Sequence, residues 1–167
     1  EDIYNFEDLL MVGCALNSFI RKSDVVKIAC IAQLVNAIAP IMTEKRGPAW
    51  RQTTYFPFEF ASNYGRGKAL DLKVSSPSYD NDIADNIPYL DIAAVENTDK
   101  HISFFAINRH PEEIIEVSVN LNGYKIFKID KHLKITNSNL LATNSSKFEK
   151  VKPVVENNSS HDEKKLH

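Results

Sequence analysis

One apolar run near the N-terminus constrains the fold of this chain more than any other feature. Residues 25–41 are nearly all apolar, and the amide of Gln33 punctures the run near its centre. Apolar runs bounded by turn-forming residues are typical of strands buried on both faces, as in parallel α/β sheets. The sequence therefore predicts a buried strand over residues 25–34. Gln33 lies near the carboxyl end of this strand, which is where barrels of parallel strands bind ligands.

Helices are predicted on both sides of this strand. Apolar residues recur at helical spacing over residues 6–21, with Asn5 as the expected N-cap and Asp8 in the first turn. A second helix is expected over residues 52–64, and Pro57 inside it should make the helix bend or begin irregularly. Residues 1–66 are therefore interpreted as an α/β fragment, a last strand-helix unit rather than a complete barrel.

The periodicity changes after residue 67. Strands are predicted over residues 68–74, 89–96 and 101–108, and the clearest two-residue alternation follows over residues 115–121. Asn122-Gly123 predicts a hairpin turn that leads to a return strand over residues 124–129. Residues 67–167 are interpreted as an all-β antiparallel sandwich. Their polar composition from about residue 143 predicts a poorly ordered, solvated tail.

Composition excludes several classes of function. The chain has 167 residues, 43% of them hydrophobic, and a formal net charge of −2, so a polyanionic partner such as nucleic acid is not expected. The apolar run is too short and too interrupted to span a bilayer, so no membrane partner is expected. No histidine or cysteine spacing suggests a metal, and no phosphate-binding loop suggests a cofactor. Cys14 and Cys30 are interpreted as buried small residues, with a disulfide between them left open.

Three side chains are candidates for a sugar contact or for catalysis. Gln33 could hydrogen-bond the hydroxyl groups of a sugar, or it could be a buried amide satisfied by backbone, and the sequence leaves both open. Trp50 could stack on a sugar ring, although a loop anchor packed on the next helix is the simpler interpretation. Glu44 is interpreted as a solvated loop charge, because glycoside hydrolysis needs two facing carboxylates and Glu44 has no partner nearby in sequence.

A family resemblance extends over residues 8–143. It is carried by Lys27-Ile28-Ala29-Cys30-Ile31-Ala32-Gln33-Leu34-Val35-Asn36-Ala37-Ile38-Ala39-Pro40-Ile41, by Ala49-Trp50-Arg51-Gln52-Thr53, by Ala61-Ser62-Asn63-Tyr64-Gly65-Arg66-Gly67 and by Phe105-Ala106-Ile107-Asn108-Arg109. In order and spacing these segments resemble the C-terminal part of α-L-arabinofuranosidases of glycoside hydrolase family 51.

The resemblance implies a TIM barrel, a (β/α)8 fold, followed by a β-sandwich. Residues 1–66 would be helix 7, strand 8 and helix 8 of the barrel, and Gln33 would contact the arabinofuranose. The family uses a retaining mechanism with an acid/base Glu and a nucleophile Glu, both on earlier barrel strands. No residue of this chain is therefore given a catalytic role, and the chain is expected to be a piece of a longer protein and inactive by itself.

The resemblance also implies partners. The intact enzyme would release terminal arabinofuranosyl residues from arabinan or arabinoxylan-type glycans, and it would assemble as a homo-oligomer. No cofactor is expected, and both a cytoplasmic and a secreted location stay open. The alternative from another class is a non-catalytic β-sandwich that serves as a carbohydrate-binding or oligomerisation module. In either case, residues 1–66 should dock on the sandwich or on a second copy, because their apolar side chains cannot all face water.

Overall fold

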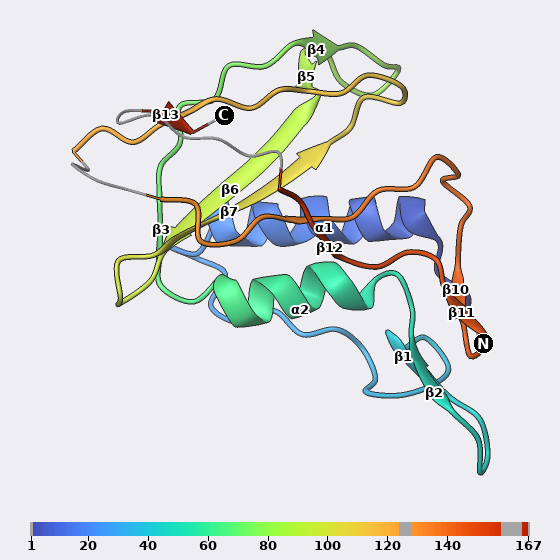
Figure 1. The fold of residues 1–167 in the computed structure, drawn as a ribbon. Coiled ribbons are helices and arrows are strands. Elements are labelled where there is room, and N and C mark those ends of the chain that lie inside the picture. Colours follow the sequence, from blue (N-terminus) through green and yellow to red (C-terminus); the bar gives the residue numbers. More distant parts are fainter. Residues whose placement is uncertain (1, 124–127, 158–164, 167) are drawn as a thin grey trace.

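Two helices and a three-stranded antiparallel sheet organise the chain (Figure 1). The structure, a computed structural model, describes residues 2–123, 128–157 and 165–166. Helix α1 (Phe6–Arg21) lies against helix α2 (Tyr55–Tyr64) on one side and against the sheet on another. No described helix is long and apolar enough to cross a membrane.

Helix α1 begins at the predicted residue. The side chain of Asn5 accepts a hydrogen bond from the Asp8 N–H (3.0 Å), and the Asp8 carboxylate accepts one from the Asn5 N–H (2.8 Å). This reciprocal pair satisfies two backbone donors that a helix otherwise leaves free at its first turn. The predicted helix over residues 6–21 is confirmed at both ends.

Helix α2 starts three residues later than predicted. Pro57 is its third residue, where the missing N–H would have had no intrahelical partner, so the proline is accommodated in the first turn. Residues 52–54 precede the helix as a buried segment and are all 2% exposed or less. Gly65 follows the last turn, and its N–H donates to the Ala61 carbonyl at 2.9 Å.

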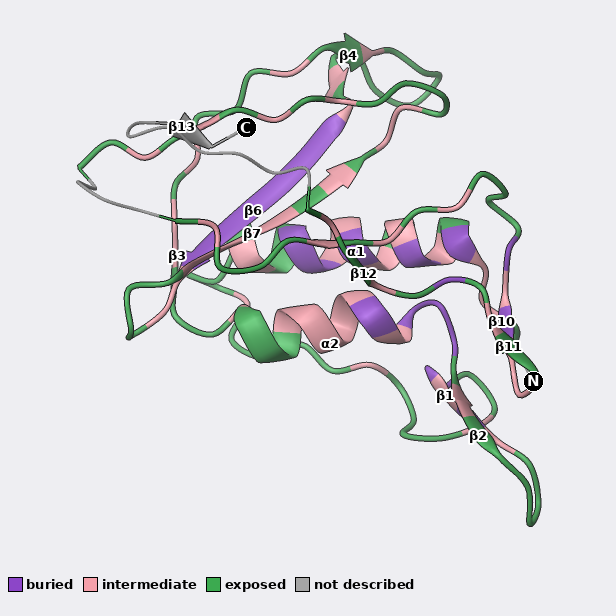
Figure 2. Ribbon diagram, in the orientation of Figure 1, coloured by how far each residue is buried: buried purple, intermediate pink, exposed green. Residues whose placement is uncertain are grey.

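The main sheet has the order β3-β6-β7, with β3 (Lys68–Ala69), β6 (Leu90–Glu96) and β7 (Ile102–Asn108). Strands β6 and β7 pair from Leu90↔Asn108 to Glu96↔Ile102. Strand β6 is buried along nearly its whole length (Figure 2), because it is the central strand and α1 packs on it. The strands predicted over residues 89–96 and 101–108 are thus confirmed, while the one over residues 68–74 shortens to β3.

The remaining strands are short and pair antiparallel, which the sequence predicted only for the part after residue 67. These pairs are β1 (Ile41–Thr43) with β2 (Ala49–Arg51), β4 (Ser78–Tyr79) with β5 (Ile87–Pro88), β8 (Val119–Asn120) with β13 (Lys165–Leu166), β9 (Leu133–Lys134) with β12 (Val154–Val155), and β10 (Asn144–Ser145) with β11 (Phe148–Glu149).

The predicted hairpin around Asn122-Gly123 differs from the structure. Of the alternating residues 115–121, only Val119–Asn120 forms a strand, and it pairs with β13. Residues 124–127 of the predicted return strand lie outside the described residues, and residues 128–129 carry no strand. Alternation indicates a strand but not its partner, which distant pairing decides.

The prediction of a solvated tail from residue 143 does not fit Asn144 and Val151, although residues 147, 148, 150, 152, 154, 155 and 157 are exposed. Val151 is fully buried and joins Phe6, Leu9, Phe56 and Ala142 in the core between the two helices. Asn144 is also buried, because its side chain exchanges hydrogen bonds with the backbone N–H (2.9 Å) and carbonyl (2.7 Å) of Val151. In this polar segment, one buried apolar side chain and one buried amide whose hydrogen bonds are satisfied are enough to hold the backbone against the helices.

The buried strand predicted over residues 25–34 is the main departure. These residues form no strand, and Val25, Ile28 and Leu34 are 71%, 82% and 79% exposed. A strand of a parallel sheet needs neighbouring strands for its hydrogen bonds, and no described strand pairs with this segment. Cys30 is exposed too, contrary to its predicted burial, Cys14 is half-buried, and both are free thiols.

Candidate functional site

Gln33 lies near the end of the exposed apolar segment 25–34, on an open hollow beside α2. This hollow, here called the Gln33 hollow, has a volume of about 460 Å³ and is lined by Gln33, Leu34, Tyr55, Phe58, Glu59 and Asn63, among others. Gln33 is exposed and has φ +56°, and its amide makes no hydrogen bond to the described residues. The interpretation of Gln33 as a buried amide satisfied by the backbone therefore does not fit this conformation. Its contact with a sugar stays a prediction.

Gln52, unlike Gln33, is a buried amide with its hydrogen bonds satisfied. Its Nε2 donates to the carbonyls of Ala39 (2.9 Å) and Asp2 (3.1 Å), and its Oε1 accepts from the Tyr4 N–H at 3.0 Å. Gln52 thereby ties the N-terminal residues to the start of α2. Sequence reasoning missed this role because Gln52 stands beside polar neighbours rather than inside an apolar run.

Trp50 lies on a second hollow, between the β1–β2 and β10–β11 hairpins. This hairpin hollow also has a volume of about 460 Å³, and its lining includes Trp50, Arg51, Tyr55, Ser146, Phe148 and Glu149. Trp50 pairs across the hairpin with Met42, which is buried. Strand alternation places these two side chains on the face opposite Ala49 and Arg51, and Trp50 itself is half-buried.

Arg51 joins the two hairpins. Its Nε and Nη2 both donate to the Glu149 carboxylate at 2.9 Å, a planar two-bond fork. The guanidinium carbon also lies 5.1 Å from the centre of the Phe56 ring and 5.7 Å from that of Tyr55. Arg51 therefore lies at one wall of the hairpin hollow, where its guanidinium contacts the Glu149 carboxylate and the two aromatic rings at the same time.

Glu44 belongs to the same surface. Its carboxylate accepts a hydrogen bond from the Ser146 hydroxyl at 2.8 Å, so it links the β1–β2 turn to the β10–β11 turn. Among the residues that line the hairpin hollow, the one carboxylate is that of Glu149, and it is paired with Arg51. The interpretation of Glu44 as a loop charge rather than a catalyst is consistent with this arrangement.

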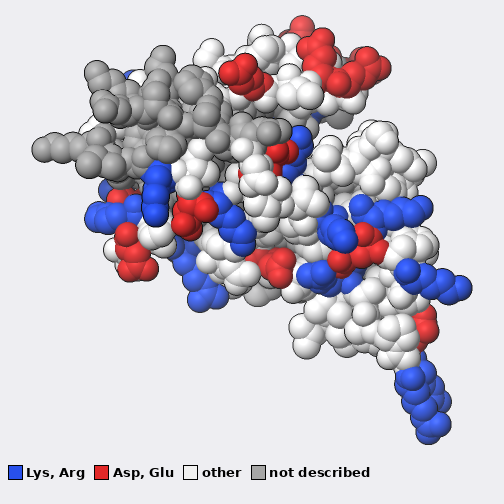
Figure 3. Space-filling model, viewed as in Figure 1, with Lys and Arg blue, Asp and Glu red and all other residues white. Residues whose placement is uncertain are grey.

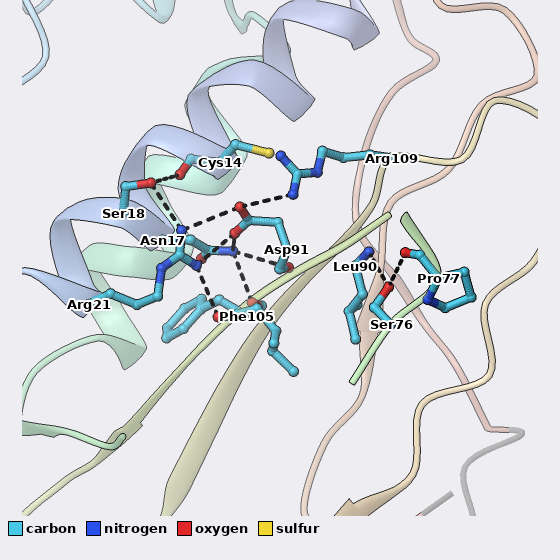
Figure 4. A network of polar contacts seen from close by, with 11 residues as sticks. Cys14, Asn17, Ser18, Arg21, Ser76, Pro77, Leu90, Asp91, Phe105 and Arg109 are labelled. Atoms are coloured by element: carbon cyan, nitrogen blue, oxygen red, sulfur yellow. Dashed lines mark hydrogen bonds and ion pairs between the residues drawn. The ribbon is translucent and has the colours of Figure 1, made fainter. Parts of the chain in front are cut away.

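A polar network, which sequence reasoning did not find, joins α1 to the sheet (Figure 4). Asp91 of the buried strand β6 accepts from Asn17 Nδ2 at 2.9 Å and from Arg21 Nη1 at 2.9 Å, and Arg109 lies 3.8 Å away. Asn17 also donates to the Phe105 carbonyl, and Arg21 to the Ile92 carbonyl. A carboxylate inside an otherwise apolar strand was the sequence signal for this network.

The electrostatics of Asp91 follow from these contacts. Burial favours the neutral acid and by itself would raise the pKa of Asp91, but hydrogen bonds from Arg21 and Asn17, with the charges of Arg21 and Arg109, lower it below its usual value. Burial and the Asp91 charge raise the pKa of the nearby Cys14 thiol. The network holds the helix to the sheet, and it lies away from both hollows.

An aromatic stack covers the end of the sheet near the β4–β5 hairpin. The ring of Tyr89 lies 4.9 Å from Tyr79 and 4.5 Å from the His110 imidazole, centre to centre. Tyr89 is half-buried and contacts both of these neighbours. Elsewhere in the described chain, no group of three or more acidic, histidine or cysteine side chains is placed to hold a metal ion.

Comparison with known proteins gives a consistent family. The model of the α-L-arabinofuranosidase C-terminal domain matches residues 1–167. An intracellular exo-α-(1→5)-L-arabinofuranosidase of Halalkalibacterium halodurans and one of Bacillus subtilis are each 43% identical over 167 residues. In both cases the match covers 99% of this chain and 33% of the relative, so the chain spans about one third of their length.

Solved structures agree with the sequence comparison. The family 51 α-L-arabinofuranosidase of Bifidobacterium longum superposes with a TM-score of 0.89 at 30% identity, over 99% of this chain and 33% of that one. The α-L-arabinofuranosidase of Thermotoga maritima, solved in complex with arabinose, gives a TM-score of 0.77 at 25% identity, over 93% and 34%. The chain therefore belongs to the α-L-arabinofuranosidase C-terminal domain family and corresponds to the C-terminal portion of glycoside hydrolase family 51 enzymes.

Proposed function

We propose that this chain is the C-terminal third of a retaining, exo-acting α-L-arabinofuranosidase. The observation that carries the proposal is the 43% identity, over nearly the whole chain, to two relatives named as exo-α-(1→5)-L-arabinofuranosidases. The intact enzyme would hydrolyse terminal arabinofuranosyl residues from arabinan or arabinoxylan-type glycans. The two catalytic carboxylates would lie on the part of the enzyme that precedes this chain.

Residues 1–66 are assigned to the end of a (β/α)8 barrel, with α1 as helix 7, residues 25–34 as strand 8 and α2 as helix 8. The exposed apolar side chains of residues 25–34 support this assignment, because a strand of a parallel barrel is buried on both faces and therefore needs apolar residues on both. Residues 67–167 are assigned to the β-sandwich that follows the barrel.

Gln33 is assigned to substrate binding. In the proposed barrel it stands at the carboxyl end of strand 8, and its amide is free of other partners within the described chain. An amide offers a donor and an acceptor at once, which suits a sugar hydroxyl that does the same. Trp50 is a weaker candidate for stacking on the sugar, since it is half-buried on the strand opposite Met42.

The sandwich would brace the barrel and contribute to a homo-oligomer. The contacts of α1 with strands β6 and β7, and the shared core of Phe6, Phe56 and Val151, support the bracing role. For the oligomer, light scattering on the full-length protein would give a mass of at least two subunits, and a strict monomer would contradict this part of the proposal.

The function is tested with 4-nitrophenyl α-L-arabinofuranoside. The full-length protein should release 4-nitrophenol, and this chain alone should release none above the uncatalysed rate, because it lacks both catalytic carboxylates. Turnover by this chain alone would contradict the placement of the carboxylates, and an inactive but folded full-length protein would contradict the activity itself.

A further inference from the structure

Two residues just after Gln33 have a left-handed backbone. The φ angles of Asn36 and Ala37 are +61° and +53°. Asparagine adopts this conformation readily, whereas alanine is strained in it because its Cβ crowds the carbonyl oxygen that follows. A strained turn persists only where surrounding contacts hold it, and such turns cluster at binding and catalytic sites. The turn at residues 36–37 is therefore a candidate for a role in the reaction.

The side chain of Asn36 closes this turn onto strand β1. Its Oδ1 accepts a hydrogen bond from the Thr43 N–H at 2.7 Å, and its Nδ2 donates to the Thr43 hydroxyl at 2.8 Å. The backbone N–H of Asn36 donates to the Ile41 carbonyl at 2.8 Å. These bonds between Asn36 and residues 41–43 are here called the Asn36 clamp. Figure 1 shows the segment before them running past α2 toward β1. Figure 3 shows few charged side chains on the visible face near that end of α2.

The other end of the turn is tied to the buried segment before α2. Ala39 and Pro40 are buried, and their carbonyls accept from Gln52, from Nε2 at 2.9 Å and from the backbone N–H at 2.8 Å respectively. Pro40 lines the Gln33 hollow together with Gln33 itself. Only two residues separate Gln33 from Asn36, so their Cα atoms lie at most about 11 Å apart. The clamp therefore limits where Gln33 can lie relative to the wall of its own hollow.

We propose that Asn36 is a positioning residue for hydrolysis of the arabinofuranoside. Its clamp fixes the point where the proposed strand 8 ends and so holds the Gln33 amide toward the sugar. This inference rests on the proposed function, because it takes Gln33 as a sugar contact. Both partners of the Asn36 side chain are atoms of Thr43, so the clamp needs no strand from the preceding part of the enzyme. An amide held in place before the substrate arrives loses less conformational freedom on binding it.

The test measures kcat/KM of the full-length protein for 4-nitrophenyl α-L-arabinofuranoside. Asn36→Gly keeps the left-handed conformation accessible but removes both side-chain bonds, and it should lower kcat/KM about tenfold. Asn36→Asp keeps acceptors for the Thr43 N–H and hydroxyl and should stay within about threefold of the wild type. Asn81→Ala is the matched control, because Asn81 Oδ1 also accepts from backbone N–H groups, those of Ile83 and Ala84, in the distant β4–β5 turn. It should leave kcat/KM unchanged.

Coupling to Gln33 distinguishes positioning from a general effect on the fold. In the Gln33→Ala background, Asn36→Gly should change kcat/KM by less than about twofold, because no amide is left to position. Losses that multiply in the double variant would overturn the inference. A wild-type rate in Asn36→Gly, or in Gln33→Ala, would overturn it as well.

Hydrogen exchange of the Thr43 amide separates the clamp from the proposed function. Asn36→Gly should speed this exchange about tenfold or more, because the Thr43 N–H loses its acceptor, and Asn81→Ala should not. Unchanged exchange in an active Asn36→Gly protein would overturn the clamp alone. A folded but inactive wild-type protein would overturn the proposed function, and the positioning role with it.

Discussion

Asp91 shows how one charged residue can join a helix to a sheet. It is 8% exposed, and its carboxylate is surrounded by Asn17 and Arg21 from α1 and by Arg109 from the end of β7. Burial of a carboxylate is costly unless donors replace the lost water, and here three side chains do so. The contact between α1 and the sheet therefore depends on a small set of polar atoms as well as on apolar area.

Replacing Asp91 with Asn should destabilise the protein. The neutral amide leaves Arg21 and Arg109 without their carboxylate, which should lower the free energy of unfolding by about 1–3 kcal/mol. Urea denaturation of the full-length protein measures this value, with the exposed Asp71→Asn as the matched control, which should change it little. An equal effect of both substitutions would show that the network adds nothing to stability.

The same variant makes a prediction on pH. The pKa of Asp91 is lower in the folded state than in the unfolded state, so its contribution to stability is present above the unfolded value of about 4 and is lost as the pH falls through the folded value. The difference in unfolding free energy between wild type and Asp91→Asn should therefore be constant near pH 6–7 and shrink below about pH 4. A difference that grows on acidification would contradict the lowered pKa.

Gln33 and Gln52 show what sequence can and cannot say about a single amide. Gln33 drew attention because it interrupts an apolar run, and the structure leaves it exposed and unbonded within the described chain. Gln52 makes the buried hydrogen bonds that were expected of an amide inside an apolar run. Hydrophobic context identifies an unusual polar residue, but its partners come from distant parts of the chain, which no local pattern encodes.

Substitution of Gln33 tests its assignment to the substrate. Gln33→Ala in the full-length protein should lower kcat/KM for 4-nitrophenyl α-L-arabinofuranoside about 10- to 100-fold, the range expected for losing one or two sugar hydrogen bonds. The thermal stability should stay close to that of the wild type, because the amide makes no bond to described residues. Gln52→Ala should do the reverse, with a clear loss of stability from its three buried bonds. Unchanged kinetics in Gln33→Ala would remove this residue from the site.

Helices and strands whose formation depends on neighbouring residues were predicted correctly from the sequence. The capping pair of Asn5 and Asp8 fixed the start of α1, and strands β6 and β7 followed from their composition. The predicted burial of residues 25–34 and of residues 143–157 differs from the structure, because their burial depends on contacts with distant parts of the chain. The first segment lacks neighbours within the described chain, and the second gains them from the helices through Val151.

Gly67 makes a testable contact at the junction between α2 and β3. Its φ is +151°, and a Cβ at this position would clash with the backbone carbonyl of Glu96 on strand β6. Gly67→Ala should therefore lower the free energy of unfolding by more than about 1 kcal/mol. Gly123→Ala, also at positive φ but with open space around it, is the comparison and should cost less. Equal losses would mean that backbone strain, and not the contact with β6, limits position 67.

For the molecule as a whole, the two parts of the chain share one core. Sequence periodicity placed a boundary near residue 67, but α1 packs on the sheet and residues 137–155 return to the helices. The expectation that residues 1–66 dock on the second part agrees with these contacts. Several large apolar side chains of segment 25–34 are exposed, and the proposed barrel would cover them with strands from the preceding part of the enzyme.

The reactivity of Cys30 in the full-length protein tests this most directly, because Cys30 is exposed here and would be enclosed as part of a barrel strand. Alkylation is followed by mass spectrometry of the peptide that contains Cys30, with the same protein unfolded in guanidinium chloride as the reference. Completion of a barrel predicts a rate about 100-fold or more below that reference. A rate within a few-fold of the unfolded protein would mean that residues 25–34 stay open to solvent and do not form the last strand of a catalytic barrel.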